Sequence, residues 1–250
     1  MITSTSSSQV KYVVNLQKKA KLRKEEKQFV VEGIKMVSEA PTDRLVKVYI
    51  SETFKADNEE FLERMNYDSI GKDVLEIVTD NVFMRMADTQ TPQGIMAVVR
   101  MSDTDLEGIL SDKRNPLLLI IENLQDPGNL GTIVRMAEGA GVTGIIMSSN
   151  TVDIYNPKTI RSTMGSLYRV PVIYVDDICE AADVCKSKGV TVYAAHLKGT
   201  DNYNKKDYTN PTAFMIGNEG NGLTDKLADK ADEYVRIPMQ GEVESLNAAI

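Results

Sequence analysis

Short apolar runs alternate with amphipathic stretches along most of the chain. In the first hundred residues, runs of strand length lie at Phe29–Val31, Leu45–Ser51, Leu75–Val78 and Ile95–Arg100. Between them the spacing predicts helices over residues 10–21, 33–40, 58–65 and 81–87. Strands that alternate with helices in this way predict a small α/β domain.

A polar and acidic stretch, residues 101–115, interrupts this pattern, with a short helix expected at 106–110. We place a domain boundary in it, giving domains 1–104 and 105–250. The most apolar run of the chain, Leu117 to Ile121, follows and predicts a central strand of a parallel sheet. Further strands are expected at 144–147, 170–175, 190–195, 213–216 and 234–237, and helices at about 132–139, 157–164 and 176–188. The second domain is therefore also expected to be α/β.

Two of these strands end in loops with unusual residues. The run Phe214–Ile216 stops at Gly217-Asn218-Glu219-Gly220, and the run Val235–Ile237 stops at Pro238. Glycines let a flat ligand lie against the backbone, and strand-end loops suit a small polar ligand with an aromatic base. Ordinary turns are the alternative, but a turn needs neither Glu219 nor Asn247. We expect Ser245 to cap a helix that begins at Leu246.

The loop from Asp126 to Gly131 matches neither a dinucleotide-binding fingerprint nor a phosphate-binding P-loop. Asn129 is expected near a helix N-terminus, where amide and backbone donors can meet a phosphate. Arg135 follows six residues later. From this segment alone, the interpretation of Asn129 as a cap residue and Arg135 as a solvated helix residue is slightly favoured. The single histidine, His196, is expected to pack, and no group of residues has metal-ligand spacing.

Composition narrows the classes of protein that fit. With 42% hydrophobic and 26% charged residues, two cysteines and no apolar run of membrane-spanning length, the chain is expected in the cytoplasm with reduced thiols. The start of the chain lacks the features of a secretory signal. The net charge is −7, yet residues 1–30 carry +5 and the remainder −12. A basic arm of this kind either holds a phosphate backbone or is a solvated helix face.

Three motifs in order resemble those of the SpoU (TrmH-like) family of RNA ribose 2′-O-methyltransferases. They are NLQDPGNLGTIVRMAEGAGV (residues 123–142), FMIGNEGNGL (214–223) and IPMQGEVESLN (237–247). The N-terminal stretch VKYVVNLQKKAKLRKEEKQFVVEG is also similar to an RNA-binding domain found in members that modify ribosomal RNA. The resemblance covers nearly the whole chain.

The resemblance implies a knotted parallel-sheet α/β methyltransferase domain, preceded by a small α/β RNA-binding domain and working as a homodimer. It implies S-adenosylmethionine as cofactor and no metal. By motif position the catalytic residues are expected to be Asn129, Arg135, Glu219 and Asn247. The cofactor-binding residues are expected to be Gly217, Asn218, Gly220, Ile237, Met239, Ser245 and Leu246. In the family the third motif continues into a helix at the dimer interface, whereas this sequence stops at Ile250.

We therefore expect S-adenosylmethionine-dependent 2′-O-methylation of RNA, with 23S-type ribosomal RNA as the substrate. The basic arm assigns RNA contacts to Lys18, Lys19, Lys21 and Arg23. Two alternatives stay open, namely a non-catalytic RNA-binding protein that keeps the fold and a tRNA 2′-O-methyltransferase. A nucleotide-binding oxidoreductase lacks its glycine fingerprint here.

Overall fold

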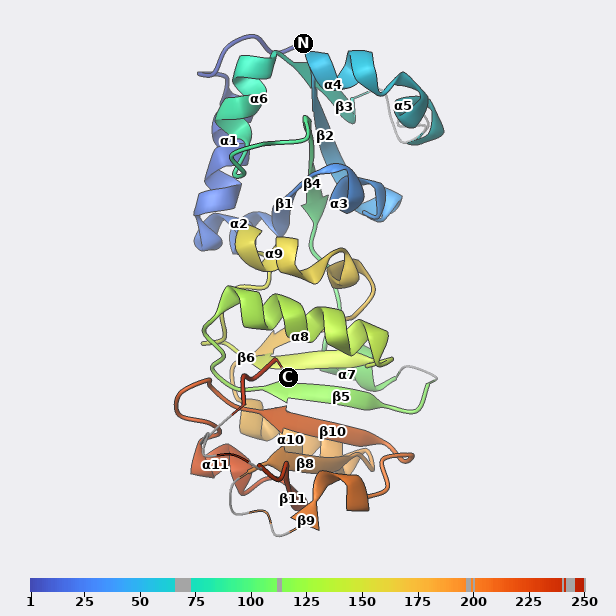
Figure 1. Cartoon of the computed structure of the whole chain (residues 1–250), viewed down its shortest axis with the longest axis vertical. Coiled ribbons are helices and arrows are strands. Elements are labelled where there is room, and N and C mark those ends of the chain that lie inside the picture. The colour runs from blue at the N-terminus through green and yellow to red at the C-terminus, as the bar shows by residue number, and fades with distance from the viewer. Residues whose placement is uncertain are drawn as a thin grey trace. The chain divides into compact units, whose positions relative to one another are not determined.

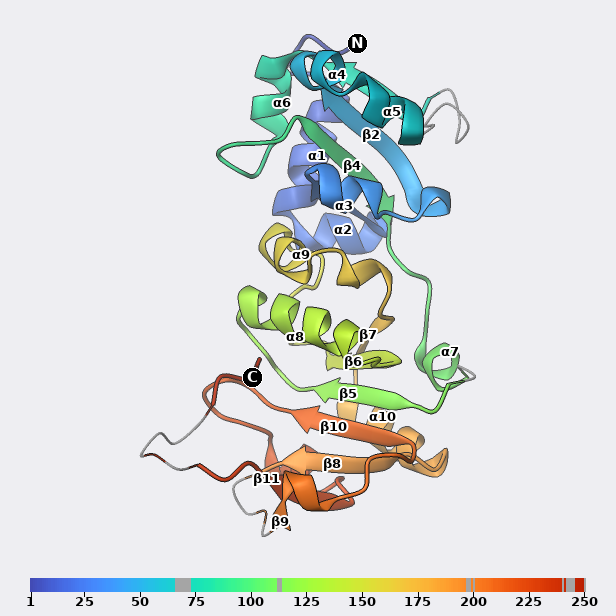
Figure 2. The ribbon, with the colours of Figure 1, turned by 45° about the vertical axis from the view of Figure 1, so that its right-hand side comes forward.

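A computed structural model describes residues 1–65, 73–111, 114–196, 199, 201–239, 241 and 246–249 (Figures 1 and 2). The chain forms two compact units. The first comprises Met1–Met101 and Tyr155–Tyr168, and the second comprises Ser102–Ile154 and Arg169–Ile250. Residues 155–168, from the second half of the sequence, thus belong to the first unit. The functional domain limits, 1–104 and 105–250, stay a prediction.

The first unit is built on a four-stranded sheet in the order β1-β4-β2-β3. Its strands are β1 (Gln28–Glu32), β2 (Leu45–Ser51), β3 (Leu75–Val78) and β4 (Ile95–Arg100). Strand β4 is antiparallel to both of its neighbours, whereas β2 and β3 are parallel. All four predicted strands are confirmed.

The described helices around this sheet include α1 (Ser8–Lys18), α2 (Ala20–Glu26), α3 (Ile34–Ser38), α4 (Glu52–Asp57), α5 (Glu59–Met65) and α6 (Asp80–Met86). Figure 1 shows α1 and α6 side by side, and both bury apolar residues in one core with Val30 and Val98 of the sheet. The single helix predicted over 10–21 is wrong in one respect. It breaks at Lys19, whose backbone is extended, so that two helices form.

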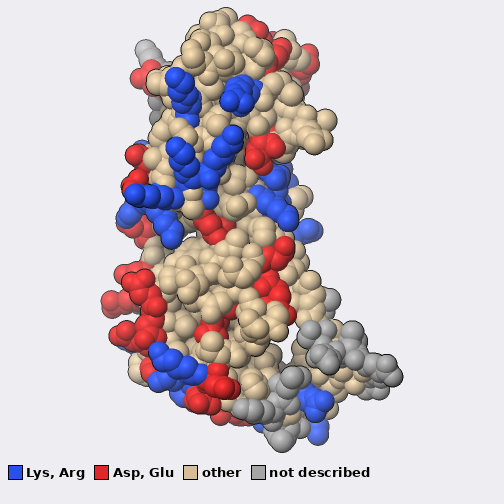
Figure 3. Space-filling model, turned by 90° about the vertical axis from the view of Figure 1, so that its left-hand side faces the viewer, with Lys and Arg blue, Asp and Glu red and all other residues tan. Residues whose placement is uncertain are grey.

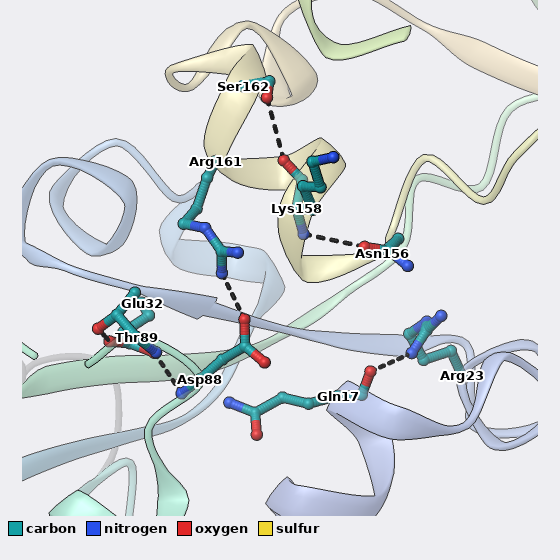
Figure 4. Close-up of polar contacts among 9 residues, drawn as sticks. All are labelled: Gln17, Arg23, Glu32, Asp88, Thr89, Asn156, Lys158, Arg161 and Ser162. Atoms are coloured by element: carbon teal, nitrogen blue, oxygen red, sulfur yellow. Dashed lines mark hydrogen bonds and ion pairs between the residues drawn. The ribbon is translucent and has the colours of Figure 1, made fainter. Parts of the chain in front are cut away.

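The returning segment contains the predicted helix α9 (Pro157–Thr163) and packs against the first unit. The rings of Phe29 and Tyr155 lie 4.7 Å apart between centroids. Arg161 reaches from α9 to Asp88, with 2.6 Å between nitrogen and oxygen (Figure 4). Helix α9 is therefore fastened to the first unit by an apolar contact and an ion pair.

The second unit contains a seven-stranded sheet in the order β7-β6-β5-β10-β8-β11-β9, in which every described strand pair is parallel. The strands are β5 (Leu117–Ile121), β6 (Gly144–Ser148), β7 (Val172–Val175), β8 (Thr191–Ala195), β9 (Asp201–Asn202), β10 (Thr212–Ile216) and β11 (Glu233–Arg236). Strand β5 has a parallel neighbour on each side, as its continuous apolar run predicted. The predicted α/β class is confirmed.

The helices of this unit are α7 (Leu106–Leu110), α8 (Pro127–Gly139), α10 (Ile178–Ser187) and α11 (Asp225–Ala228). Helix α10 packs its buried residues against Leu118 and Ile120 of β5. It carries both cysteines as buried reduced thiols, as predicted, and burial raises the pKa of the Cys185 thiol to about 11. Among the described helices none is long and apolar enough to cross a membrane.

Two ends of elements differ from the prediction. Helix α8 begins at Pro127 rather than near residue 132, because Asp126 caps it by accepting a hydrogen bond from the Asn129 N–H at 2.7 Å. Asn129 therefore lies in the first turn of the helix. The prediction of a helix that begins at Leu246 is wrong for the described residues, since 246–249 form only a turn. Its predicted cap, Ser245, lies outside the described residues.

Candidate active site

A pocket of about 690 Å³ lies at the carboxyl ends of β5 and β10. Parallel α/β sheets bind ligands at this edge, because the loops that follow neighbouring strands meet there. The residues that line it are Gln125, Asp126, Pro127, Asn129, Glu219 and Asn247. Three of the four predicted catalytic residues are thus brought together from sequence motifs up to 118 positions apart.

The carboxylate of Glu219 joins the loop after β10 to the start of α8. Its Oε1 accepts hydrogen bonds from the Asp126 N–H at 2.9 Å and from the Asn129 side-chain amide at 3.2 Å. Its Oε2 accepts one from the Gln125 N–H at 3.1 Å. Burial alone would raise the pKa of Glu219, but these hydrogen bonds outweigh it and lower the pKa below its ordinary value. Glu219 is therefore an anion that orients the Asn129 amide.

The loop that carries Glu219 closes on itself. The N–H of Asn218 donates to the Gly222 carbonyl at 3.0 Å, and the N–H of Gly222 donates back at 2.9 Å. A Cβ on Gly217 would lie only 2.1 Å from the Gly222 carbonyl carbon. The glycine is thus required by the loop's own backbone. A bulky substitution at Gly217 would distort the loop before it met a ligand, so it is not a clean test of cofactor contact.

Those of the predicted cofactor-binding residues that the structure describes lie in this loop or after β11, and none of these described residues lines the 690 Å³ pocket. Ile237 and Leu246 expose 46% and 41% of their surface. Met239 is half-buried, and Ser245 lies outside the described residues. The assignment of these residues to the cofactor stays a prediction.

Arg135 is the predicted catalytic residue that the structure does not place with the others. It lies on the exposed side of α8 and is not among the residues that line the pocket. Its role in catalysis also stays a prediction. His196 stacks on Tyr234 with 4.9 Å between ring centroids, in line with the packing role expected from the sequence.

The predicted RNA contacts lie at the junction of α1 and α2. Lys18, Lys19 and Lys21 are exposed, and Figure 3 shows Lys and Arg side chains spread over the face of the first unit on which these helices lie. Arg23 differs, because only 3% of it is exposed. Its guanidinium donates to the Leu16 carbonyl oxygen at 2.6 Å. It also donates to the Gln17 carbonyl oxygen at 2.8 Å (Figure 4). The structure therefore contradicts a phosphate contact by Arg23, which instead satisfies the last carbonyls of α1.

Gln125 and Asp126 line the pocket but were not predicted as site residues. Gln125 lines the pocket while its side-chain amide donates to the carbonyls of Asn123 and Asn150 at 3.0 and 2.9 Å. The pair Asp126-Pro127 is a signal for the first residues of a helix, with the aspartate as cap and the proline at the first helical position. That signal identifies the start of α8, although it does not show that Glu219 forms hydrogen bonds with the residues at this start.

These observations define a protein of two units. One is a parallel α/β unit with a site beside the glycine loop, at the carboxyl edge of its sheet. The other carries a basic junction between two helices. Comparison with known families agrees. Residues 116–250, more than half of the chain, match the model of the SpoU rRNA methylase family. Residues 7–97 match an MRM3-like substrate-binding domain. The chain belongs to the SpoU rRNA methylase family.

Individual relatives agree with this assignment. The chain is 34% identical over 180 residues to RlmP of Bacillus subtilis, a 23S rRNA (guanosine(2553)-2′-O)-methyltransferase, a match that covers 70% of this chain and 67% of RlmP. It is 34% identical over 165 residues to a 23S rRNA (uridine(2479)-2′-O)-methyltransferase of Streptomyces viridochromogenes, covering 64% and 57% of the two chains. The crystal structure of an AdoMet-bound rRNA methyltransferase from Sinorhizobium meliloti matches with a TM-score of 0.84 and 28% identity, covering 99% of this chain and 92% of that one.

Proposed function

We propose that this protein transfers a methyl group from S-adenosylmethionine to a ribose 2′-hydroxyl of ribosomal RNA, with 23S-type RNA as the substrate. One observation carries the proposal beyond family membership. The first, second and third motifs meet in one pocket, where Glu219 fixes the Asn129 amide and Asn247 lines the same wall. This arrangement of polar side chains supports an active enzyme over a non-catalytic RNA-binding protein that keeps the fold.

Bound S-adenosylmethionine supplies a methyl group that its sulfonium already activates. The protein has to hold the cofactor, align the hydroxyl and assist loss of the hydroxyl proton. Alignment alone can lower a barrier by about 7–11 kcal/mol. The residues that would hold the cofactor are Gly217, Asn218, Gly220, Ile237, Met239, Ser245 and Leu246.

The polar residues divide the remaining work. The Asn129 amide, held by Glu219 at 3.2 Å, orients the ribose or its phosphate, and Asn247 adds a second amide to the pocket. Arg135 activates the hydroxyl. Because a guanidinium stays protonated in proteins, Arg135 acts as a hydrogen-bond donor, and a substrate phosphate accepts the proton that the hydroxyl loses.

The first unit holds the RNA. Lys18, Lys19 and Lys21 supply phosphate contacts on the MRM3-like substrate-binding domain. Such contacts fix the position of the RNA without reading its bases, so the choice of nucleotide requires further contacts.

A homodimer, a knotted chain path and a cytoplasmic location complete the proposal. The return of Asn247 to the pocket that Glu219 lines supports a C-terminal segment that passes beside the glycine loop. The exposure of Arg135 on α8 supports a site completed by contacts from outside this chain's own pocket. The cytoplasmic location follows from the proposed ribosomal RNA substrate.

Two measurements test the proposal. Calorimetry should show binding of S-adenosylmethionine, which a non-catalytic RNA-binding protein would lack. Incubation with cofactor and either ribosomal RNA or tRNA, followed by mass spectrometry of the nucleosides, should give a 2′-O-methylated nucleoside only from ribosomal RNA. Methylation of tRNA instead would favour the tRNA alternative, and binding of RNA without binding of cofactor would favour the non-catalytic one.

A further inference from the structure

Glu122 is a buried carboxylate that the proposed reaction does not use. It follows the last residue of β5, and its N–H donates to the Ile216 carbonyl at 2.9 Å, which extends the pairing of β5 with β10. Only 5% of the residue is exposed. In the part of the chain that the structure describes, no lysine or arginine forms an ion pair with it. A carboxylate buried without a cation is costly unless hydrogen bonds compensate.

Those hydrogen bonds come from a single residue, Thr224. One carboxylate oxygen of Glu122 accepts from the Thr224 N–H at 2.7 Å and the other accepts from the Thr224 hydroxyl at 2.8 Å. The same hydroxyl oxygen accepts the Leu227 N–H at 3.3 Å and so caps α11. A hydroxyl has one hydrogen, so donation to Glu122 leaves its lone pairs for the helix. The two residues therefore fit each other in one orientation.

Thr224 is the exit of the glycine loop, residues 217–223. Glu219 fastens the middle of this loop to Gln125 and Asp126, and the Asn218 side chain fastens its entry by donating to the Asn123 carbonyl at 2.8 Å. The hydrogen bonds between Glu122 and Thr224 hold the exit of the loop, which is its third anchor. All three anchors lie on the short connection between β5 and α8.

We propose that Glu122 is a positioning residue for cofactor binding, which acts by fixing the exit of the glycine loop. The inference rests on the proposed function, because Gly217, Asn218 and Gly220 of this loop are cofactor residues only in that proposal. An apolar side chain at position 122 would fill the space without charge burial, but it would give no directional contact to Thr224. Displacement of binding groups by about 1 Å is enough to weaken a preorganised site.

The test measures the affinity for S-adenosylmethionine by calorimetry, together with kcat and KM in methyl transfer. Glu122→Ala should raise Kd and the cofactor KM about tenfold or more, while kcat at saturating cofactor stays within about threefold of wild type, as expected for a loss of ground-state binding. Glu122→Gln keeps the shape and one acceptor, so its Kd should lie between those of wild type and Glu122→Ala.

Thr224 provides the matched controls. Thr224→Ser keeps both donors and should bind the cofactor as wild type does. Thr224→Val keeps the shape but loses the hydroxyl, so it should raise Kd in the same direction as Glu122→Ala. The double variant Glu122→Ala/Thr224→Val should bind the cofactor no more than about twofold more weakly than Glu122→Ala. Both substitutions act on the same contact, so their effects should not add.

A merely structural role would give a different result. The melting temperature of Glu122→Ala would fall, yet Kd measured on the folded protein would equal that of wild type, and this would overturn the inference. If Glu122→Ala does not fold, Thr224→Val decides in the same way. Failure of the wild-type protein to bind S-adenosylmethionine would instead overturn the proposed function, so the two failures are distinguishable.

Discussion

The α1–α2 junction and the carboxyl edge of β5 and β10 differ in where their charged side chains lie. At the junction, Lys18, Lys19 and Lys21 are exposed on the surface. At the edge, Glu122 is buried and Glu219 accepts hydrogen bonds from two backbone N–H groups of the β5–α8 connection and from the Asn129 side chain of α8. Exposed charges act over a distance and are screened by salt, whereas buried charges act through geometry and are screened much less.

Under the proposed function, this difference would give the two regions different steps. A surface of mobile cations attracts any phosphate backbone and tolerates the loss of one member. A set of fixed carboxylates and amides orients a small number of atoms and tolerates little displacement. Variants at the junction should therefore alter the salt dependence of RNA binding, and variants at the edge should alter cofactor affinity or turnover.

The largest effect is expected at Arg135. Arg135→Ala should lower methyl transfer at saturating RNA and cofactor by at least about 100-fold, the lower range for groups that assist proton transfer. Arg135→Lys should restore little, because an ammonium lacks the planar donor arrangement of a guanidinium. Single-turnover kinetics measure this. The control is Met136→Ala, the neighbouring residue on α8 with 44% exposure, which should keep the wild-type rate. A near-normal rate for Arg135→Ala would remove Arg135 from the mechanism.

A smaller effect is expected when the three exposed lysines of the junction, Lys18, Lys19 and Lys21, are replaced together by alanine. Loss of three phosphate contacts should reduce the slope of log K against log salt concentration by about two to three. Cofactor affinity should not change. RNA binding measured from low to high salt gives the slope. A charge-matched control replaces three exposed lysines elsewhere: Lys35, Lys55 and Lys188. Equal slopes for the two triple variants would show that the junction is only solvated.

Substitution of Arg23 compares a buried residue of the junction with its exposed lysines. Arg23→Met removes the donors to the Leu16 and Gln17 carbonyls, and unsatisfied buried acceptors cost about 1–3 kcal/mol each. The free energy of unfolding should fall, and thermal or urea unfolding measures it. Lys19→Met should change that free energy by no more than about 0.5 kcal/mol. A wild-type stability for Arg23→Met would contradict the structural role of Arg23.

The smallest effect is a pH dependence at Glu219. Its folded pKa lies below the ordinary value of 4.5, so the stability from its hydrogen bonds is fully present above that value and is lost as pH falls through the folded pKa. The stability difference between wild type and Glu219→Gln should therefore shrink as the pH is lowered from about 6 to about 3. Urea unfolding across this range measures it. A constant difference would mean that Glu219 has an ordinary pKa.

Much of the fold could be predicted from the sequence because local patterns determine it. The continuous apolar run at Leu117–Ile121 identified the strand inside the parallel sheet, and the alternation of strands and helices gave the α/β class. The return of residues 155–168 to the first unit could not be predicted. It depends on pairings such as Phe29 with Tyr155, which lie far apart in sequence.

Residues of the site could be predicted from the sequence, but their arrangement in space could not. Motif resemblance selected Asn129, Glu219 and Asn247, which the pocket brings together. Net charge placed Arg23 among the RNA contacts, because composition does not distinguish an exposed guanidinium from one that caps a helix. Gly217 was assigned to ligand approach, whereas the structure shows that the loop's own backbone requires it.

The most direct test of the central claim asks which atom accepts the methyl group. After the modified nucleotide is mapped, methyl transfer from labelled S-adenosylmethionine is measured on the ribosomal RNA fragment and on the same fragment with a single 2′-deoxy substitution at that nucleotide. The account predicts transfer to the unmodified fragment and none to the deoxy fragment. Equal labelling of the two fragments would contradict it, since the methyl group would then be attached to the base.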